Sequence, residues 1–236
     1  SPPDGYTLTL IASSYTVNPS IYKFSFDPVN DITPIIQLSQ GPLLIVAKPS
    51  GTAKLTTAAL SVNTGGQKLL LTGGTLDLNG CNIQVSRLSN DGGQTSGVVK
   101  NNGAANAVLT VGRENITNAD YTFDGALQDG VMKLGLTLPR GASSGGNNRN
   151  CLVLTGANNT YSGATTIGSG STGTIAVLGN GAVNALSRNS AVTVNSSSIL
   201  DLLGNNVTIG SLAGAGIVQT NGTLLFNGTN FTMNVS

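Results

Sequence analysis

Gly74-Thr-Leu-Asp-Leu-Asn-Gly80 returns about half the chain later as Ser198-Ile-Leu-Asp-Leu-Leu-Gly204. Each copy continues with an asparagine and an aliphatic residue, at Asn82-Ile83 and at Asn206-Val207, and then enters a Gly-rich turn. The copying covers a whole motif, so chance explains it poorly. An internal repeat is the sequence signature of a stacked architecture.

The composition favours the same architecture. The chain has 236 residues, of which 9% are charged and 4% aromatic, with 32 glycines and neither Trp nor His. Ordinary globular domains carry about 25% charged residues. Short runs of Val, Ile, Leu and Thr alternate with Gly, Asn and Ser, which is typical of short strands and turns. We therefore expect an all-β fold of stacked coils, a parallel β-helix (solenoid), over residues 55–236.

In such a solenoid each coil lays short strands in parallel on the coils before and after it, about 4.8 Å apart. Coils of about 20 to 25 residues are expected. Alternation points Leu76, Leu78, Leu200 and Leu202 inward and the aspartates between them, Asp77 and Asp201, outward. Gly and Asn at the corners supply the positive φ that a turn needs, and the asparagines can stack as hydrogen-bonded ladders.

Residues 152–167 carry a more specific pattern, Leu-Val-Leu-Thr-Gly-Ala-Asn-Asn-Thr-Tyr-Ser-Gly-Ala-Thr-Thr-Ile. This stretch resembles the passenger-associated repeats of bacterial autotransporters, as do the two Leu-Asp-Leu units and Ala191-Val-Thr-Val-Asn195. The resemblance covers about three quarters of the chain. It implies a surface-displayed, right-handed parallel β-helix (solenoid) followed by a translocation barrel, which would lie beyond Ser236.

The amino-terminal segment, residues 1–54, is of α/β type. It contains Pro3-Asp-Gly-Tyr-Thr-Leu8, Asn18-Pro-Ser-Ile-Tyr22 and Asp27-Pro-Val-Asn-Asp-Ile-Thr-Pro34. In this order and spacing the three motifs resemble the periplasmic substrate-binding receptors of tripartite tricarboxylate transporters. The resemblance implies that Ser13 and Ser14 lie beside a bound carboxylate, since hydroxyls and backbone amides can hold one.

The rest of the receptor fold does not follow residue 54, and a cleft between two lobes cannot be built from this segment alone. Three readings of residues 1–54 stay open. They are part of a periplasmic receptor for di- or tricarboxylates, a cap on the solenoid end, or a natural or artefactual fusion of two unrelated proteins.

Catalysis has little support in the sequence. Without histidine there is no conventional nucleophile pair and no His metal ligand. The nearest acidic grouping is Asp120, Asp124 and Asp129, which could supply a carboxylate pair for glycoside hydrolysis, although this stretch is better explained as a coil turning at Gly130. We predict that the protein is not an enzyme and uses no cofactor or metal.

The remaining expectations concern partners and location. A net charge of +1 with scattered cations excludes an electrostatic footprint for nucleic acid, and no apolar stretch approaches a membrane span. Cys81 and Cys151 share no metal spacing, and isolated thiols are favoured over a disulfide. We expect a structural, adhesive protein on the cell surface or outside a Gram-negative bacterium, contacting a host or neighbouring-cell surface or matrix, with a periplasmic location as the alternative.

Overall fold

A computed structural model shows that the described part of the chain is built from strands. It describes residues 52–55, 68–71, 73–90, 97–112, 119–140, 149–169, 175–219 and 224–226. Contacts divide the chain into two units, Ser1–Leu43 and Leu44–Ser236, and every described residue lies in the second. Within these residues all secondary structure is β, and every strand pairing is parallel.

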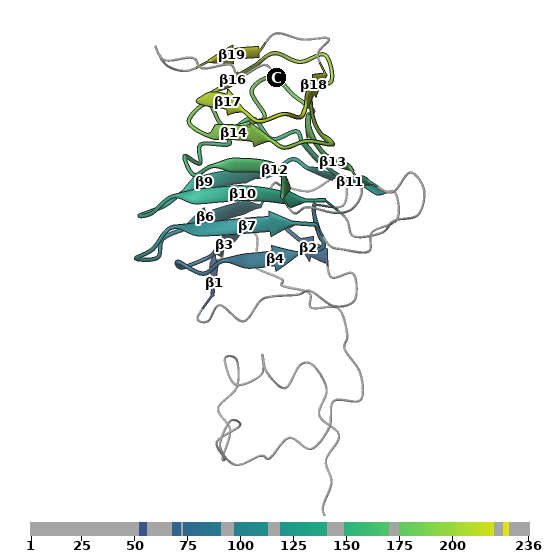
Figure 1. Cartoon of the computed structure of the whole chain (residues 1–236). Coiled ribbons are helices and arrows are strands. Elements are labelled where there is room, and N and C mark those ends of the chain that lie inside the picture. Colours follow the sequence, from purple (N-terminus) through teal and green to yellow (C-terminus); the bar gives the residue numbers. More distant parts are fainter. Residues whose placement is uncertain are drawn as a thin grey trace, which may run out of the picture. The chain divides into compact units, whose positions relative to one another are not determined.

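The strands stack on three faces, which the chain visits in turn (Figure 1). The first face begins with β1 (Thr52–Lys54), β3 (Thr75–Asp77), β6 (Val98–Asn101) and β9 (Ala126–Asp129). The second face is a single sheet of β4 (Ile83–Val85), β7 (Ala107–Val111), β10 (Leu134–Pro139), β12 (Thr165–Ser169), β14 (Ala191–Val194) and β17 (Ser211–Ala213).

The third face consists of two sheets. One pairs β2 (Lys68–Leu70) with β5 (Arg87–Ser89). The other orders β8 (Ala119–Phe123), β11 (Arg149–Leu154), β13 (Ile175–Asn180), β15 (Ser198–Asp201) and β18 (Ile217–Gln219). β5 lies beside β8 without pairing with it. The third face therefore changes sheets between these two strands.

The first face continues beyond β9 through hydrogen bonds rather than regular strands. The backbone N–H of Thr160 donates to the carbonyl of Leu127, and the Asn159 amide donates to the carbonyl of Ala185 in the next coil. Asn184 then bonds to the carbonyl of Asn206 at 2.9 Å. There β16 (Val207–Ile209) and β19 (Leu224–Phe226) resume the pairing.

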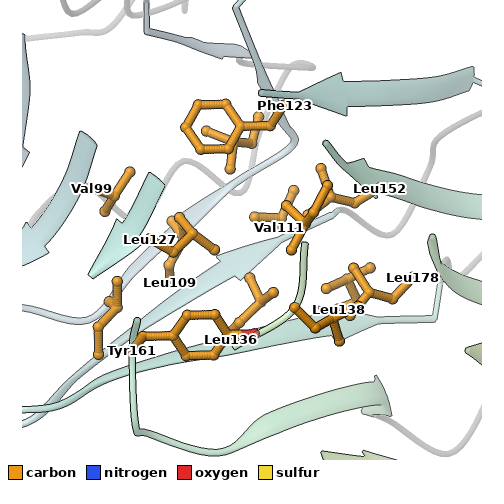
Figure 2. Packing of buried hydrophobic residues seen from close by; sticks show 14 of the residues in the cluster. Val99, Leu109, Val111, Phe123, Leu127, Leu136, Leu138, Leu152, Tyr161 and Leu178 are labelled. Atoms are coloured by element: carbon orange, nitrogen blue, oxygen red, sulfur yellow. The ribbon is translucent and has the colours of Figure 1, made fainter. Parts of the chain in front are cut away.

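The interior is filled by aliphatic side chains from all three faces. Figure 2 shows Leu127 of the first face, Leu136 of the second and Leu152 of the third among side chains that converge on the core, and each is at most 1% exposed. The core also contains Leu76, Leu78, Leu200 and Leu202, each fully buried. Both the all-β parallel solenoid and the inward direction of these four leucines are confirmed.

The two copies of the sequence repeat have the same local geometry on different faces. In the first copy β3 leads into β4, from the first face to the second. In the second copy β15 leads into β16, from the third face to the first. The repeated unit is thus a strand, a corner and the next strand, and its second copy is displaced by one face around the solenoid.

The coil length of about 20 to 25 residues that the sequence analysis expects is wrong for much of the chain. The coil that brings Val207 into register with Leu224 is shorter than expected, whereas the coil that brings Tyr121 into register with Leu152 is longer. Strand registers are kept between neighbouring coils although the lengths of chain between paired strands differ. Coil length therefore varies without breaking the stack.

Candidate functional site

Buried asparagines bind neighbouring coils together at the corners. Asn101 is fully buried, and its Oδ1 accepts from the N–H of Gly80 at 2.8 Å and of Gly103 at 3.3 Å. Its Nδ2 donates to the carbonyls of Ala105 and Lys133, both at 2.9 Å. Gly80 and Lys133 belong to the coils before and after it. The expected ladder of stacked asparagines is thus replaced by single asparagines that bond to backbone.

The motif at residues 152–167 is likewise structural. Asn159 accepts from the N–H of Leu127 at 2.6 Å and donates to the carbonyls of Gly156 and Ala185, so it connects three coils. The Tyr161 hydroxyl lies 2.8 Å from Thr165 Oγ1, which lies 2.8 Å from Ser190 Oγ. Three polar residues of this motif, Asn159, Tyr161 and Thr165, are therefore bonded inside the fold.

Burial also perturbs the acidity of Tyr161. Desolvation raises the pKa of its phenol to about 12, against the opposing effect of its hydrogen bonds to Thr165, Ser190 and Ser187. A neutral, fully buried phenol at ordinary pH is a structural group with no access to a substrate.

The acidic grouping predicted as a candidate carboxylate pair is divided between two corners. The carboxylate of Asp129, at the end of β9, accepts from the N–H of Leu134 at 2.8 Å and from the N–H and hydroxyl of Ser162. Asp124 lies at the end of β8 on another face, and its Oδ1 is buried with no hydrogen-bond partner. Asp120 lies within β8, in register with Cys151. The carboxylate of Asp129 therefore fastens one coil to the next.

The outward surface of the first face carries charged and polar side chains in one column. Strand register aligns Lys54, Asp77, Lys100 and Gln128. Alternation predicts an outward, exposed position for Asp77, yet this residue is only 3% exposed, and its carboxylate accepts hydrogen bonds from the N–H and the side chain of Asn102 in the next coil. Asp201, its counterpart in the repeat, accepts from the N–H of Leu203 and is partly exposed.

The second face carries threonines in the equivalent column. The register aligns Thr110, Thr137, Thr166 and Thr193, each of them partly exposed. Successive members are separated by a whole coil of sequence, so only the strand register reveals that they are neighbours. The sequence analysis missed this column.

The third face carries aliphatic side chains. Register aligns Cys151, Val177, Ile199 and Ile217, and exposure grows along this column from 5% at Cys151 to 56% at Ile217. Leu203 is 48% exposed and adjoins the same surface, since its Cδ1 lies where a side chain at Gly179 would begin. The three faces thus present charged, hydroxylated and aliphatic columns in turn.

One cation contacts an aromatic ring where the third face changes sheets. The guanidinium of Arg87, on β5, lies 4.7 Å from the centroid of the Tyr121 ring on β8. Such a contact contributes about 0.5 to 2 kcal/mol, depending on desolvation. It joins two strands that have no ladder between them.

Other expected groups supply no site in the described residues. Ser13 and Ser14 lie outside them. Cys81, at a corner, and Cys151, on β11, form no disulfide. Among the residues that the structure describes, no group of three or more Cys, Asp or Glu is arranged to hold a metal ion. The same residues contain no helix that is long and apolar enough to cross a membrane.

Comparison with known proteins identifies one family, at the amino-terminal end. Neither a curated protein nor a solved structure matches the chain. The family match ends at residue 69 and so includes β1, which pairs with β3, and part of β2, which pairs with β5. Residues 1–69 match the model of the tripartite tricarboxylate transporter family receptor.

Proposed function

We propose that this chain is a surface-displayed or secreted β-solenoid passenger with a structural and adhesive role and no catalysis. The resemblance of residues 152–167 to autotransporter passengers supports the assignment. The observation that carries it is the use of polar side chains between coils: the buried Asn101 and Asn159 and the half-buried Asp129 each bond across coils. Such bonds stiffen the stack and leave the outward columns as the surface for contact.

The proposal includes a location and a class of partner. The protein acts on the cell surface or outside a Gram-negative bacterium and contacts a host or neighbouring-cell surface or matrix. A translocation barrel following residue 236 would place it there. Regular outward columns present the same chemistry several times, and repeated weak contacts give avidity without a deep pocket.

Attachment of coated beads tests the adhesive role. Beads bearing the full chain should adhere to epithelial cells or to immobilised matrix more than beads bearing a scrambled sequence of the same composition. Two variants would show which surface attaches. One places lysine at two outward third-face positions, Ile199→Lys and Ile217→Lys, and the other is Gln128→Lys on the first face. Adhesion equal to that of the scrambled control argues against the role.

A second function is favoured by the family match to residues 1–69. In this reading the chain derives from a periplasmic receptor for di- or tricarboxylates, with Ser13 and Ser14 beside the ligand carboxylate. Titration calorimetry with citrate and succinate tests it. Saturable heat that Ser13→Ala and Ser14→Ala abolish, and that the exposed corner change Ser197→Ala leaves unchanged, would favour the receptor over the passenger.

In a third reading the chain is a fusion of two unrelated genes, one that encodes the receptor segment and one that encodes the solenoid. Single-molecule long reads across the encoding DNA decide it. One continuous frame in every molecule supports a single protein, whereas molecules that never span codons 40 to 75 would assign the function to the solenoid alone.

A further inference from the structure

The threonine column of the second face is a regular array on a continuous sheet. β4, β7, β10, β12 and β14 lie side by side (Figure 1). Thr110 is in register with Thr137, Thr137 with Thr166, and Thr166 with Thr193. Adjacent strands are about 4.8 Å apart, so the four side chains repeat at that interval along the solenoid.

The positions beside this column keep the face flat and neutral. Val108 and Gly135 are in register on β7 and β10, and Ala191 lies two residues before Thr193 on β14. Among the described outward positions of β7, β10, β12 and β14 there is neither a charged nor an aromatic side chain. On these four strands no outward side chain is larger than valine, threonine or proline, and the column ends at Gln84 of β4, which is in register with Thr110.

Threonine makes the array rigid as well as regular. Its β-branch restricts χ1, so methyl and hydroxyl groups keep fixed directions on a strand. Each hydroxyl offers one donor and two acceptors, while each methyl restricts the orientation of first-shell water. A rigid array loses little conformational entropy when a ligand binds.

This chemistry excludes several partner classes. Nucleic acids and anionic polymers need clustered cations, and protein partners are anchored mainly by Trp, Tyr and Arg. Hydroxyl groups alone would be enough to bind a neutral polyol surface, and serine, which carries one, is frequent in this chain. All four positions nevertheless hold threonine, which adds a methyl group. A fitting partner is itself a neutral lattice that both accepts and donates hydrogen bonds and tolerates methyl groups.

The geometry points to crystalline water as that partner: the second face binds ice. The hydroxyls anchor a first layer of water through hydrogen bonds, the methyls hold that layer in cages, and the strand spacing makes the layer periodic. Ordered waters that bridge two surfaces are almost as favourable as direct hydrogen bonds. The layer then joins a growing ice surface.

Partition into growing ice tests the inference on the full chain. The unmodified protein should enter a slowly grown ice hemisphere and slow the recrystallisation of ice. Thr137→Tyr with Thr166→Tyr should abolish both effects, because the bulky rings break the flat surface. Gln128→Tyr adds the same ring on the first face and should leave both effects intact. Melting followed by circular dichroism shows that each variant keeps its fold.

A gentler variant separates water from polyols. Thr137→Ser with Thr166→Ser keeps both hydroxyls and removes both methyls, so it should lose ice partition while remaining folded. Exclusion of the unmodified protein from ice overturns the inference, as does ice partition that the tyrosine and serine variants retain. A different result would also overturn it: the unmodified protein stays out of ice but binds crystalline cellulose, the tyrosine variant loses that binding and the serine variant keeps it. That result assigns the face to polysaccharide.

This result is independent of bead adhesion. Beads that attach to cells while the protein is excluded from ice would leave the adhesive role standing and remove only the ice-binding face.

Discussion

Leu203 occupies the same left-handed turn position as Asn79, with φ of 48° against 50°, and each is followed by a glycine, at φ of 78° and 80°. The hydrogen bonds also match. Asp77 Oδ1 accepts from the N–H of Asn79 at 3.0 Å, and Asp201 Oδ1 accepts from that of Leu203 at 2.9 Å. The two copies therefore share the geometry of the corner, but the second copy has leucine at the left-handed position, where the first has the better suited asparagine.

Leu203→Asn should stabilise the protein. A left-handed conformation costs an L-residue about 1 to 2 kcal/mol, and asparagine tolerates it better than leucine. Leucine here is also 48% exposed. We expect a gain of about 0.5 to 1 kcal/mol in urea unfolding. Asn79→Leu should lose stability, since it also removes the bond from Asn79 Nδ2 to the Leu55 carbonyl. A destabilised Leu203→Asn would show that packing beside Gly179 outweighs the strain.

Asn101→Ala should be among the most damaging single changes. It leaves the N–H groups of Gly80 and Gly103 and the carbonyls of Ala105 and Lys133 without their partner. Each unsatisfied buried group costs about 1 to 3 kcal/mol, so we expect a loss of at least about 3 kcal/mol. The adjacent change Asn102→Ala removes one side-chain bond at an exposed position and should cost less than about 1 kcal/mol. Equal losses would refute this account.

Asp129→Asn tests the structural role of a carboxylate that could be mistaken for a catalytic one. The change weakens the bonds from Ser162 and Leu134 and should cost about 1 to 3 kcal/mol. Asp124→Asn is the matched control. Because the buried Oδ1 of Asp124 has no hydrogen-bond partner, this change should leave the stability of the protein unchanged or raise it. Thermal melts of both variants compare them. A neutral Asp129→Asn would contradict the fastening role.

Tyr161 should make the protein lose stability in alkali. Its pKa is about 12 when folded and 10.0 when unfolded, so its contribution is complete below pH 10 and is lost as pH rises through 12. Linkage gives a loss of about 2 kcal/mol by pH 12. Tyr161→Phe should be less stable at pH 8, for want of the bond to Thr165, but should fall less steeply above pH 10. Urea unfolding at several pH values from 8 to 12 gives the free energy of unfolding of both proteins. If that free energy falls equally steeply with pH in the unmodified protein and in Tyr161→Phe, this prediction is contradicted.

Sequence predicts those features that depend on alternation and on turn chemistry. The inward leucines flanking Asp77 and Asp201 follow from the period of two, and the corners at Gly80 and Gly204 follow from glycine. The displacement of the two copies by one face could not be predicted, because the two corners share one local geometry although they join different faces. Local sequence does not say which corner it builds.

The candidate sites depended on contacts between coils, which sequence does not contain. Asp120, Asp124 and Asp129 are close along the chain, yet a corner separates the strands that bear them. Thr137 and Thr166 are a whole coil apart in sequence and yet in register. Whether an asparagine such as Asn101 faces solvent or bridges three coils is decided by neighbours in the coils before and after it. Ser13 and Ser14 lie outside the described residues.

The displacement of the repeat has a consequence for how such a protein can change over generations. A duplicated or deleted unit need not be a whole coil, since one strand with its corner is used at two different corners of the solenoid. Losing or gaining such a unit would rotate every later side-chain column to the next face while keeping the same interior. A lineage could thereby move an entire binding array around the rod in one genetic event, without altering a single residue of the array.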